Sequence, residues 1–209
     1  MLRARKCQCE QDLDRSSFSR SSFFRYSAFV RVLTASDFLD MPWKNGGGRT
    51  LQLAIHPPGA TLETFDWRVS IATVERSGPF SAFPGCTRTL MLLDGDGFEL
   101  DIAGRRVVLD RPLEPVTFSG DDPVSCRLLG GPSHDFGVIT RNGRAKASIT
   151  IERIHGQRQL AVRRGMVVCL SGSVQAAHHT LESVSALEIT DDATLAVNGA
   201  GVVAVASIP

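Results

Sequence analysis

Short apolar segments, separated by turns rich in glycine and proline, run along most of the chain and constrain its fold more than any other feature. Turn signals such as HPPG, SGPF, DGDG and RNGR stand between these segments. Only TASDFLDM, residues 34–41, has a helical pattern, with Thr34 or Ser36 as its N-cap. Short strands spaced about 8–12 residues apart are typical of a β-sandwich or a β-barrel. We therefore predict an all-β protein with strands at residues 50–55, 67–74, 89–93, 98–102, 106–109, 148–154, 166–172, 186–190, 194–197 and 201–208.

The first 28 residues differ in composition from the rest of the chain. Residues 1–28 contain six Lys or Arg, three Asp or Glu and six Ser, and they show no apolar period. Such a segment buries too little apolar surface to offset the entropy of ordering. We interpret residues 1–29 as a disordered extension, or as upstream sequence translated from a misassigned start.

Further along, RRGMVVCLSGSVQ (163–175) repeats the strand, glycine turn and strand pattern of RTLMLLDGDGFEL (88–100), which suggests two related β-modules.

Charge, hydropathy and cysteine usage exclude several classes of protein. The 209 residues have a net charge of +1, so the overall field favours neither nucleic acid nor an anionic membrane. No apolar run approaches the roughly 20 residues that span a bilayer. The five cysteines are odd in number and scattered, unlike a disulfide framework: Cys7, Cys9, Cys86, Cys126 and Cys169. We expect reduced cysteines, a cytoplasmic location, and no nucleic-acid or membrane partner.

The segment MPWKNGGGRT, residues 41–50, contains three consecutive glycines, which is costly in backbone entropy. A phosphate-binding loop would have Lys-Ser/Thr after the last glycine and a helix behind it. Here Lys44 precedes the glycines, and Arg49-Thr50 leads into a predicted strand. The run is therefore interpreted as a turn in which the backbone approaches another chain segment or a ligand.

Two neighbouring predicted strands each have an apolar face and a small or polar face. In WRVSIATV (67–74), Trp67, Val69 and Ile71 lie on one face, and Arg68, Ser70 and Ala72 lie on the other. In TLQLAI (50–55), Thr50 and Gln52 share the polar face in the same way. This polar face is either a solvated outer surface or the interior of a barrel that is open at one end to a polar ligand.

The segment GPFSAFPGCTRTL, residues 78–90, combines a stiff turn, two phenylalanines and a cation. Phe80, Ser81 and Phe83 lie between the proline and glycine positions, and Arg88 begins the next strand. This combination suits a carboxylate pocket with an aromatic wall. The alternative is structural, with Phe80 and Phe83 filling the end of a barrel.

Four motifs that follow one another in the sequence resemble the HutD/Ves family. They are MPWKNGGGRTLQLAI (41–55), FDWRVSIATVERSGPFSAFPGCTRTLMLLDGDGFEL (65–100), VTFSGDDP (116–123) and LLGGPSHDFGVI (128–139). The resemblance covers residues 30–209 and implies a bicupin, with cupin-type barrels at residues 30–139 and 140–209. It also implies an association with histidine utilisation, no established catalytic activity, and a small carboxylate such as formylglutamate or urocanate as ligand.

With this resemblance, we predict one ligand site in the first barrel, in which Lys44, Arg68 and Arg88 recognise an anion. The other predicted members comprise neutral hydrogen-bonding groups, an aromatic wall, glycines that keep Cβ atoms away from the ligand, and an acid: Asn45, Thr50, Ser70, Ser81, Trp43, Phe80, Phe83, Gly46, Gly47 and Asp135. The rival interpretation pairs Arg68 or Arg88 internally with Asp135 or another carboxylate, so that the arginine only holds the fold. The family usually has Asn where this chain has Gly137, which changes the groups available to a ligand.

The histidines do not follow the metal-binding pattern of catalytic cupins. None of the five forms His-x-His, and the adjacent His178 and His179 would point to opposite faces of a strand. His56 precedes two prolines, and His134 is predicted in a loop. We therefore predict no metal and no cofactor.

Three functions remain open at this stage. The first is a binding protein for a small carboxylated metabolite, with a regulatory or buffering role in histidine utilisation. The second is a metal-independent cupin enzyme that acts on a histidine-degradation intermediate. The third is a structural or interaction protein whose barrels are filled with side chains. We favour the first, without catalysis, and leave open a homodimer.

Overall fold

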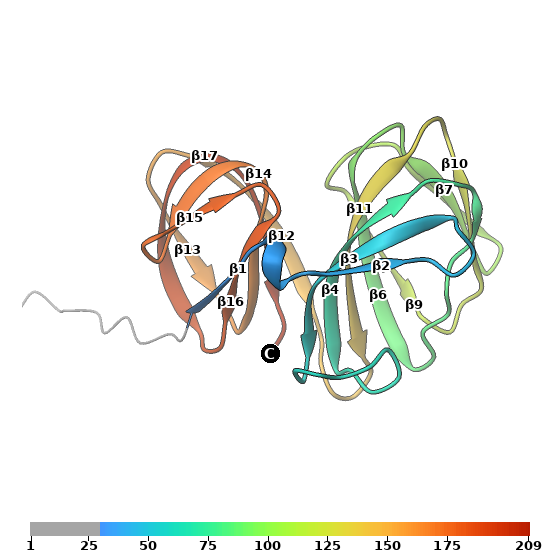
Figure 1. Cartoon of the computed structure of the whole chain (residues 1–209), viewed down its shortest axis with the longest axis horizontal. Coiled ribbons are helices and arrows are strands. Elements are labelled where there is room, and N and C mark those ends of the chain that lie inside the picture. Colours follow the sequence, from blue (N-terminus) through green and yellow to red (C-terminus); the bar gives the residue numbers. More distant parts are fainter. Residues whose placement is uncertain (1–29) are drawn as a thin grey trace, which may run out of the picture.

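The structure is a computed structural model that describes residues 30–209, and strands make up nearly all of its regular structure. Figure 1 shows two β-modules side by side. The first module contains a six-stranded sheet and a four-stranded sheet, and all strand pairs are antiparallel. The six-stranded sheet has the order β2 (Leu39–Pro42), β3 (Gly48–His56), β4 (Trp67–Val74), β11 (Ser133–Arg141), β6 (Cys86–Asp94) and β9 (Pro115–Ser119). The four-stranded sheet has the order β5 (Gly78–Pro79), β10 (Val124–Leu128), β7 (Phe98–Ile102) and β8 (Arg105–Leu109).

The second module is one antiparallel seven-stranded sheet. Its main path is β1 (Val30–Leu33), β16 (Ser185–Ile189), β14 (Gly165–Ala176), β17 (Ala193–Ser207) and β12 (Ser148–His155). Two further strands, β13 (Arg158–Val162) and β15 (His179–Glu182), pair with β17 and β14. The all-β prediction is therefore confirmed.

The first strand does not belong to the first module, although its sequence position suggested so. β1 pairs with β16, with Val30 opposite Ile189 and Leu33 opposite Ala186. In Figure 1 this blue strand lies among the orange and red strands of the second module. Val30 and Val32 pack on the core of the second module, and Leu33 is buried between the modules. The chain thus begins its described part in the second module and then crosses to the first.

The helix predicted at residues 34–41 is wrong. Only Ala35–Asp37 forms a turn of 3-10 helix (η1), and β2 begins at Leu39. Thr34 is the N-cap, as the sequence suggested, and Asp37 completes a capping box with it. Phe38 already has extended backbone, with φ of −87° and ψ of 143°. The local capping signal is therefore present, but sheet pairing with β3 ends the helix after one turn.

Strand positions agree closely with the sequence in some regions and differ in others. The predicted strands at 67–74 and 98–102 match β4 and β7. The strands predicted at 194–197 and 201–208 are one strand, β17, which continues through Gly199. The strand predicted to end at Gly172 continues to Ala176 as β14, with a β-bulge between Cys169 and Ser171. The interpretation of residues 1–29 falls outside the described residues.

Three of the apolar clusters formed by residues 30–209 are large, and each of the three contains fully buried side chains. One cluster fills the second module around Leu187 and Leu195, and another lies between the two sheets of the first module around Phe98 and Leu100. The third, which we call the shared core, joins the modules. Its buried members are Leu33, Leu53, Trp67, Val69, Ile71, Met91, Phe136, Val138, Met166, Val168, Ala186, Ala204, Ala206 and Ile208.

The shared core explains the unusual burial of β4. Of its eight residues, all but Thr73 are buried, so both faces of the strand are covered. Trp67, Val69 and Ile71 face the second module through the shared core. The opposite face, with Arg68 and Ser70, therefore points into the first module.

Three of the five cysteines lie in the described residues. Cys86, Cys126 and Cys169 are buried and free, and burial raises the pKa of each thiol. Cys7 and Cys9 lie outside the described residues.

Within residues 30–209, the structure contains no helix with the length and hydropathy needed to cross a membrane.

Candidate ligand-binding site

The three glycines form a tight turn that lets two backbone segments approach each other. Gly46 has φ of +65°, a conformation that favours glycine. A Cβ on Gly48 would lie 2.1 Å from the carbonyl oxygen of Thr73, so only glycine lets β3 approach β4 here. The Trp43 amide donates to the Gly48 carbonyl at 2.9 Å and closes the turn. The sequence left open whether the backbone of this turn approaches another chain segment or a ligand. In the structure it approaches another chain segment, strand β4.

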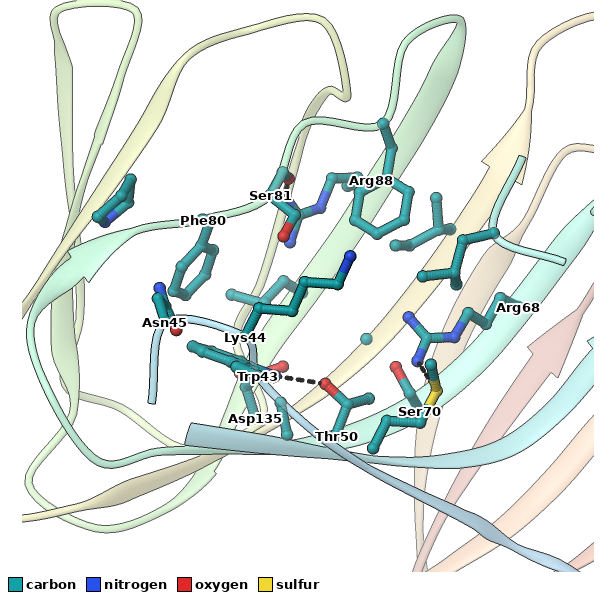
Figure 2. A pocket seen from close by; sticks show the side chains of 18 of the residues that line it. Trp43, Lys44, Asn45, Thr50, Arg68, Ser70, Phe80, Ser81, Arg88 and Asp135 are labelled. Carbon is teal, nitrogen blue, oxygen red and sulfur yellow. Dashed lines mark hydrogen bonds between the residues drawn. The ribbon is translucent and has the colours of Figure 1, made fainter. Parts of the chain in front are cut away.

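The turn shapes one side of a cavity of about 430 Å³ in the first module, a volume typical of small-molecule sites. Figure 2 shows its walls, which come from the β2–β3 turn, the polar face of β4, β6, β11 and the segment around Phe80. Eleven predicted site residues line it: Trp43, Lys44, Asn45, Thr50, Arg68, Ser70, Phe80, Ser81, Phe83, Arg88 and Asp135. Gly46 and Gly47 are absent from the lining, since they serve the turn behind it.

The polar face of β3 and β4 forms part of the inside of this cavity. Arg68, Ser70 and Ala72 of β4 line it, together with Thr50 of β3. The solvated-surface alternative for this face is therefore wrong. The reason is the shared core, which takes up the apolar face and leaves the polar face directed inward.

Arg68 is a buried cation whose contacts within the described residues are neutral. It is 5% exposed, and its Nε donates to Gln52 Oε1 at 2.8 Å. Its Nη2 lies 3.5 Å from Met41 Sδ. Burial lowers the pKa of this guanidinium. No fully buried side-chain nitrogen or oxygen within residues 30–209 lacks a partner, so the N–H groups that Arg68 leaves unused are open to the cavity.

Arg88 is half-buried, with its guanidinium over three aromatic rings. Its carbon Cζ lies 5.5, 5.3 and 5.1 Å from the ring centres of Phe80, Phe83 and Phe118. Its Nη1 donates to the Ser81 carbonyl at 2.9 Å, which fixes the side chain at the cavity wall. Burial lowers the pKa of Arg88 to about 10, although Asp135 opposes this effect. Cation–π contacts of this kind hold a guanidinium without neutralising it.

Asp135 is the acidic group of the lining. It is 4% exposed, and within residues 30–209 no side chain or backbone group forms a hydrogen bond or an ion pair with its carboxylate. Burial raises its pKa to about 7, although Arg88 and His134 act in the opposite direction. The internal ion pair between Asp135 and Arg68 or Arg88 is thus absent at 4 Å or less.

The rim of the cavity is built from Trp43, Lys44 and Asn45. Trp43 donates its indole N–H to Thr50 Oγ1 at 2.8 Å and meets Phe80 edge to face. Asn45 Oδ1 accepts from the Gly47 amide at 3.0 Å, so its carboxamide oxygen belongs to the turn. Lys44 is exposed, and Figure 2 shows its side chain extending across the cavity toward the side where Arg68 and Arg88 lie.

Nine lining residues were not among the predicted site residues, although Ala72 had been placed on the same strand face as Arg68 and Ser70. Asp135 is two positions from Gly137 on one face of β11, a pattern that could have identified Gly137 and Ile139 once that strand was predicted. Leu62 comes from an irregular loop, and no sequence signal places it here. The nine are Met41, Pro42, Leu62, Ala72, Pro79, Thr89, Leu90, Gly137 and Ile139.

The histidines lie away from this lining and have other surroundings. His56 stacks on Trp67 with ring centres 5.4 Å apart. His134 lies in β11, not in a loop as predicted, and bonds Asp94. His178 occupies a turn with φ of +67° before His179 begins β15, so the two do not alternate along one strand. In the part of the chain that the structure describes, no three His, Cys, Asp or Glu residues lie close enough to hold a metal ion.

A comparison with known protein families identifies the family of this chain. The family model for HutD matches residues 35–206, which is most of the chain and both modules. The chain belongs to the HutD family. The resemblance to HutD/Ves proteins inferred from the four motifs is confirmed.

Two relatives agree with this assignment. An uncharacterised 21.2 kDa protein in the hutC 3′ region of Pseudomonas putida is 42% identical over 120 residues, 57% of this chain and 63% of that protein. The match therefore spans somewhat less than two thirds of that relative's length. Protein Ves from Citrobacter koseri is 35% identical over 144 residues, 66% of this chain and 73% of that protein.

Solved structures extend the likeness to the whole fold. HutD from Pseudomonas fluorescens SBW25, in a formate condition, is 31% identical with a TM-score of 0.74, covering 86% of this chain and 99% of that one. A cupin 2 conserved barrel domain protein from Leptotrichia buccalis is 8% identical with a TM-score of 0.51, covering 77% and 88%. The second likeness concerns the fold alone, and it supports the cupin-type architecture predicted from the resemblance.

Proposed function

We propose that this HutD-family protein binds a small carboxylated metabolite in the cavity of the first module and serves a regulatory or buffering role in histidine utilisation. The observation that carries the proposal is Arg68, a buried guanidinium with neutral contacts and open N–H groups. A buried charge without a counter-ion is costly, and a bound anion would remove that cost. The name of the Pseudomonas putida relative, which refers to a hutC 3′ region, supports a role in histidine utilisation.

The charge balance of the lining favours a carboxylate. Lys44, Arg68 and Arg88 face one acid, Asp135, so the cavity has an excess of positive charge. A guanidinium can bind a carboxylate through two parallel N–H bonds. Trp43, Phe80 and Phe83 offer apolar surface beside these cations, which suits the carbon skeleton of a small metabolite. Formylglutamate and urocanate both combine these features.

Calorimetric titration with formate, N-formylglutamate and urocanate tests the proposal. Arg68→Met and Arg88→Met should each lower affinity for the binding ligand at least about tenfold, since a lost charged hydrogen bond amounts to roughly 1.5–3 kcal/mol. Arg141→Met is the matched control. Arg141 also lies over a phenylalanine ring, but it donates to the backbone carbonyls of Phe65 and Glu63, outside the cavity lining.

The expected pattern separates binding from folding. Arg141→Met should lower the melting temperature and leave affinity unchanged, whereas Arg68→Met should lose affinity at an unchanged or higher melting temperature. Folded Arg68→Met and Arg88→Met proteins that bind all three ligands as well as the wild type would overturn the proposal.

One observation favours a metal-independent enzyme as the second candidate. Burial raises the pKa of Asp135 to about 7, which is suited to proton transfer near neutral pH, and the side chain lies in the cavity lining. Incubation of the protein with N-formylglutamate or urocanate, followed by NMR, distinguishes the two candidates. Turnover that disappears in Asp135→Asn would support catalysis, and binding without product supports the first candidate.

A further inference from the structure

Gly137 is a glycine that the fold does not require. It lies in the middle of β11, opposite Ser70 of β4 and Leu90 of β6, and its φ is not positive. A Cβ at this position would have its nearest neighbours at 3.7 Å or more, which is ordinary contact. A glycine inside a strand costs roughly 0.5–1 kcal/mol relative to alanine.

Other glycines of the first module show what a structural requirement looks like. A Cβ on Gly48 or Gly120 would lie 2.1 or 2.2 Å from a backbone carbonyl oxygen, so any side chain there displaces a strand or turn. Gly137 has no such neighbour. In a strand, a glycine without this constraint often marks a place where a ligand approaches the backbone. Gly137 lines the cavity, so its missing side chain leaves space there.

The polar groups around this space have no partners of their own. The two atoms nearest the absent Cβ are Asp135 Oδ1 at 3.7 Å and Ser70 Oγ at 3.8 Å. Both residues are more than nine-tenths buried, and within residues 30–209 neither side chain forms a hydrogen bond. Neither oxygen is among the fully buried atoms that lack a partner, so each is open to the cavity. A carboxylate oxygen accepts hydrogen bonds, and its natural complement is an N–H donor.

We propose that the cavity surface over Gly137 is a second subsite, in which Asp135 and Ser70 bind an N–H group of the ligand whose carboxylate is held by the cations. This inference rests on the proposed function and narrows the ligand class to carboxylates that carry an amide or imidazole N–H. A side chain larger than hydrogen at residue 137 occupies the space that this group needs. Gly137 therefore determines specificity, while the cations provide the anchor.

Three probes separate the anchor from the subsite. Formate reaches the cations only. Urocanate adds an imidazole ring with an N–H donor, and 3-(2-furyl)acrylate keeps the shape but replaces the donor-bearing ring by a furan. Wild-type protein should bind urocanate at least about tenfold more tightly than furylacrylate, which corresponds to one charge-assisted hydrogen bond. Equal affinity for the two acrylates would overturn the subsite.

Variants at residue 137 provide the second arm. Gly137→Val should weaken urocanate at least about tenfold and leave formate affinity within about threefold, because only the larger ligand meets the new side chain. Gly137→Ala, whose Cβ lies at ordinary contact distances, keeps the test valid if the valine variant does not fold. Gly131→Ala is the control, since Gly131 lies outside the cavity lining and its Cβ would have one neighbour, at 3.6 Å.

The outcomes distinguish the two proposals. If formate binds and Gly137→Val and Gly137→Ala leave urocanate affinity unchanged, the subsite is wrong and the carboxylate site stands. If none of the probes binds the wild type at millimolar concentration, the carboxylate site is wrong and the subsite falls with it. Asp135→Leu, which leaves no acceptor oxygen at this position, should remove the preference for urocanate over furylacrylate and retain formate binding; an unchanged preference would also overturn the subsite.

Discussion

The interiors of the two modules are built from similar antiparallel strands but differ in chemistry. The buried cluster inside the second module consists only of aliphatic residues, alanine and cysteine, with Leu187 and Leu195 at its centre. The first module has an apolar cluster around Phe98 and, beside it, a cavity lined by cations and an acid. Polar interior groups stabilise a fold poorly, so their concentration in one module indicates where the ligand chemistry lies.

The shared core connects this difference to the support of the site. Residues of β4 and β11 contact the second module on one face and line the cavity on the other. Trp67 and Arg68 are neighbours in sequence and lie on these opposite faces. The second module therefore covers the back of the wall that positions Arg68, Ser70 and Asp135. Such support by packed side chains is what a preorganised site requires.

The largest effect should follow from placing a cation inside the second module. Leu187 is fully buried, and Leu187→Arg would bury a charge with no cavity and no counter-ion beside it. We expect a loss of at least about 3–5 kcal/mol in the free energy of unfolding, which approaches the whole stability of many domains. Urea denaturation measures the loss, with Leu187→Met as the control, expected to cost less than about 1.5 kcal/mol. A stable, folded Leu187→Arg protein would show that the second interior also accommodates charge.

Removal of an aromatic ring from the shared core should have the next largest effect. Phe136 is fully buried there, and Phe136→Ala should cost about 3–5 kcal/mol. Because the shared core includes residues of both modules, the variant should still unfold in one transition, at a lower urea midpoint. Circular dichroism and tryptophan fluorescence, which reports on the first module through Trp43 and Trp67, should give the same midpoint. Separate midpoints would mean that the modules are stable independently.

The strands of this fold can be predicted from the sequence more readily than the pairing between them. The alternation in residues 67–74 gave the bounds of β4 and both of its faces, because each residue of a strand points opposite to the next. It could not say which face was inward, since that depends on Met166 and Val168, about a hundred residues further along. The pairing of β1 with β16 is equally non-local. The short edge strand β15 has Leu181 as its one apolar residue and does not stand out, and the nine-residue β11, which lies between β4 and β6, was also not predicted.

The same limit applies to the site. Arg68, Arg88 and the aromatic residues could be predicted because cations and phenylalanines beside glycine turns are conspicuous, and the family resemblance singled out their motifs. Gly46 and Gly47 were assigned to the ligand because a glycine run fits either a ligand or a close backbone approach, and the Thr73 carbonyl that decides the matter for Gly48 lies on another strand. Leu62 enters the cavity from a loop, which has no period to detect, and Pro79 enters it from the two-residue strand β5, which is too short to show one.

The contrast between the two interiors predicts that the protein becomes more stable when the acid of the cavity is replaced by a neutral residue. The pKa of Asp135 is raised to about 7 in the folded protein, against an ordinary value near 3.9 when unfolded. Between these values the folded state holds a proton that the unfolded state has released, so this group makes stability fall as pH rises from about 4 to about 7, with no further loss above. Asp135→Asn removes this penalty and should stabilise the protein by up to about 4 kcal/mol at pH 8.

Urea denaturation of both proteins at pH 5, 6, 7 and 8 measures this effect. The advantage of Asp135→Asn should shrink steadily toward pH 5. His134 and Arg88 also act on this carboxyl, and both are retained in the variant, so the difference between the two proteins isolates Asp135. A difference that is constant from pH 5 to pH 8 would contradict the raised pKa.

The smallest effect should come from the neutral polar wall of the cavity. Thr50 accepts a hydrogen bond from the Trp43 indole at 2.8 Å, and Thr50→Val removes this acceptor while keeping the side-chain shape. Trp43 is only half-buried, so water can replace the acceptor, and the expected loss is about 0.5–1.5 kcal/mol. Thermal unfolding measures the loss, and Trp43→Phe, which removes the donor and also part of a ring that packs on Phe80, should cost more. Because the two groups act as one pair, the double variant should lose less than the sum of the single losses. A loss above about 3 kcal/mol for Thr50→Val would place the polar wall among the elements that hold the first module together, and would remove the contrast with the second module.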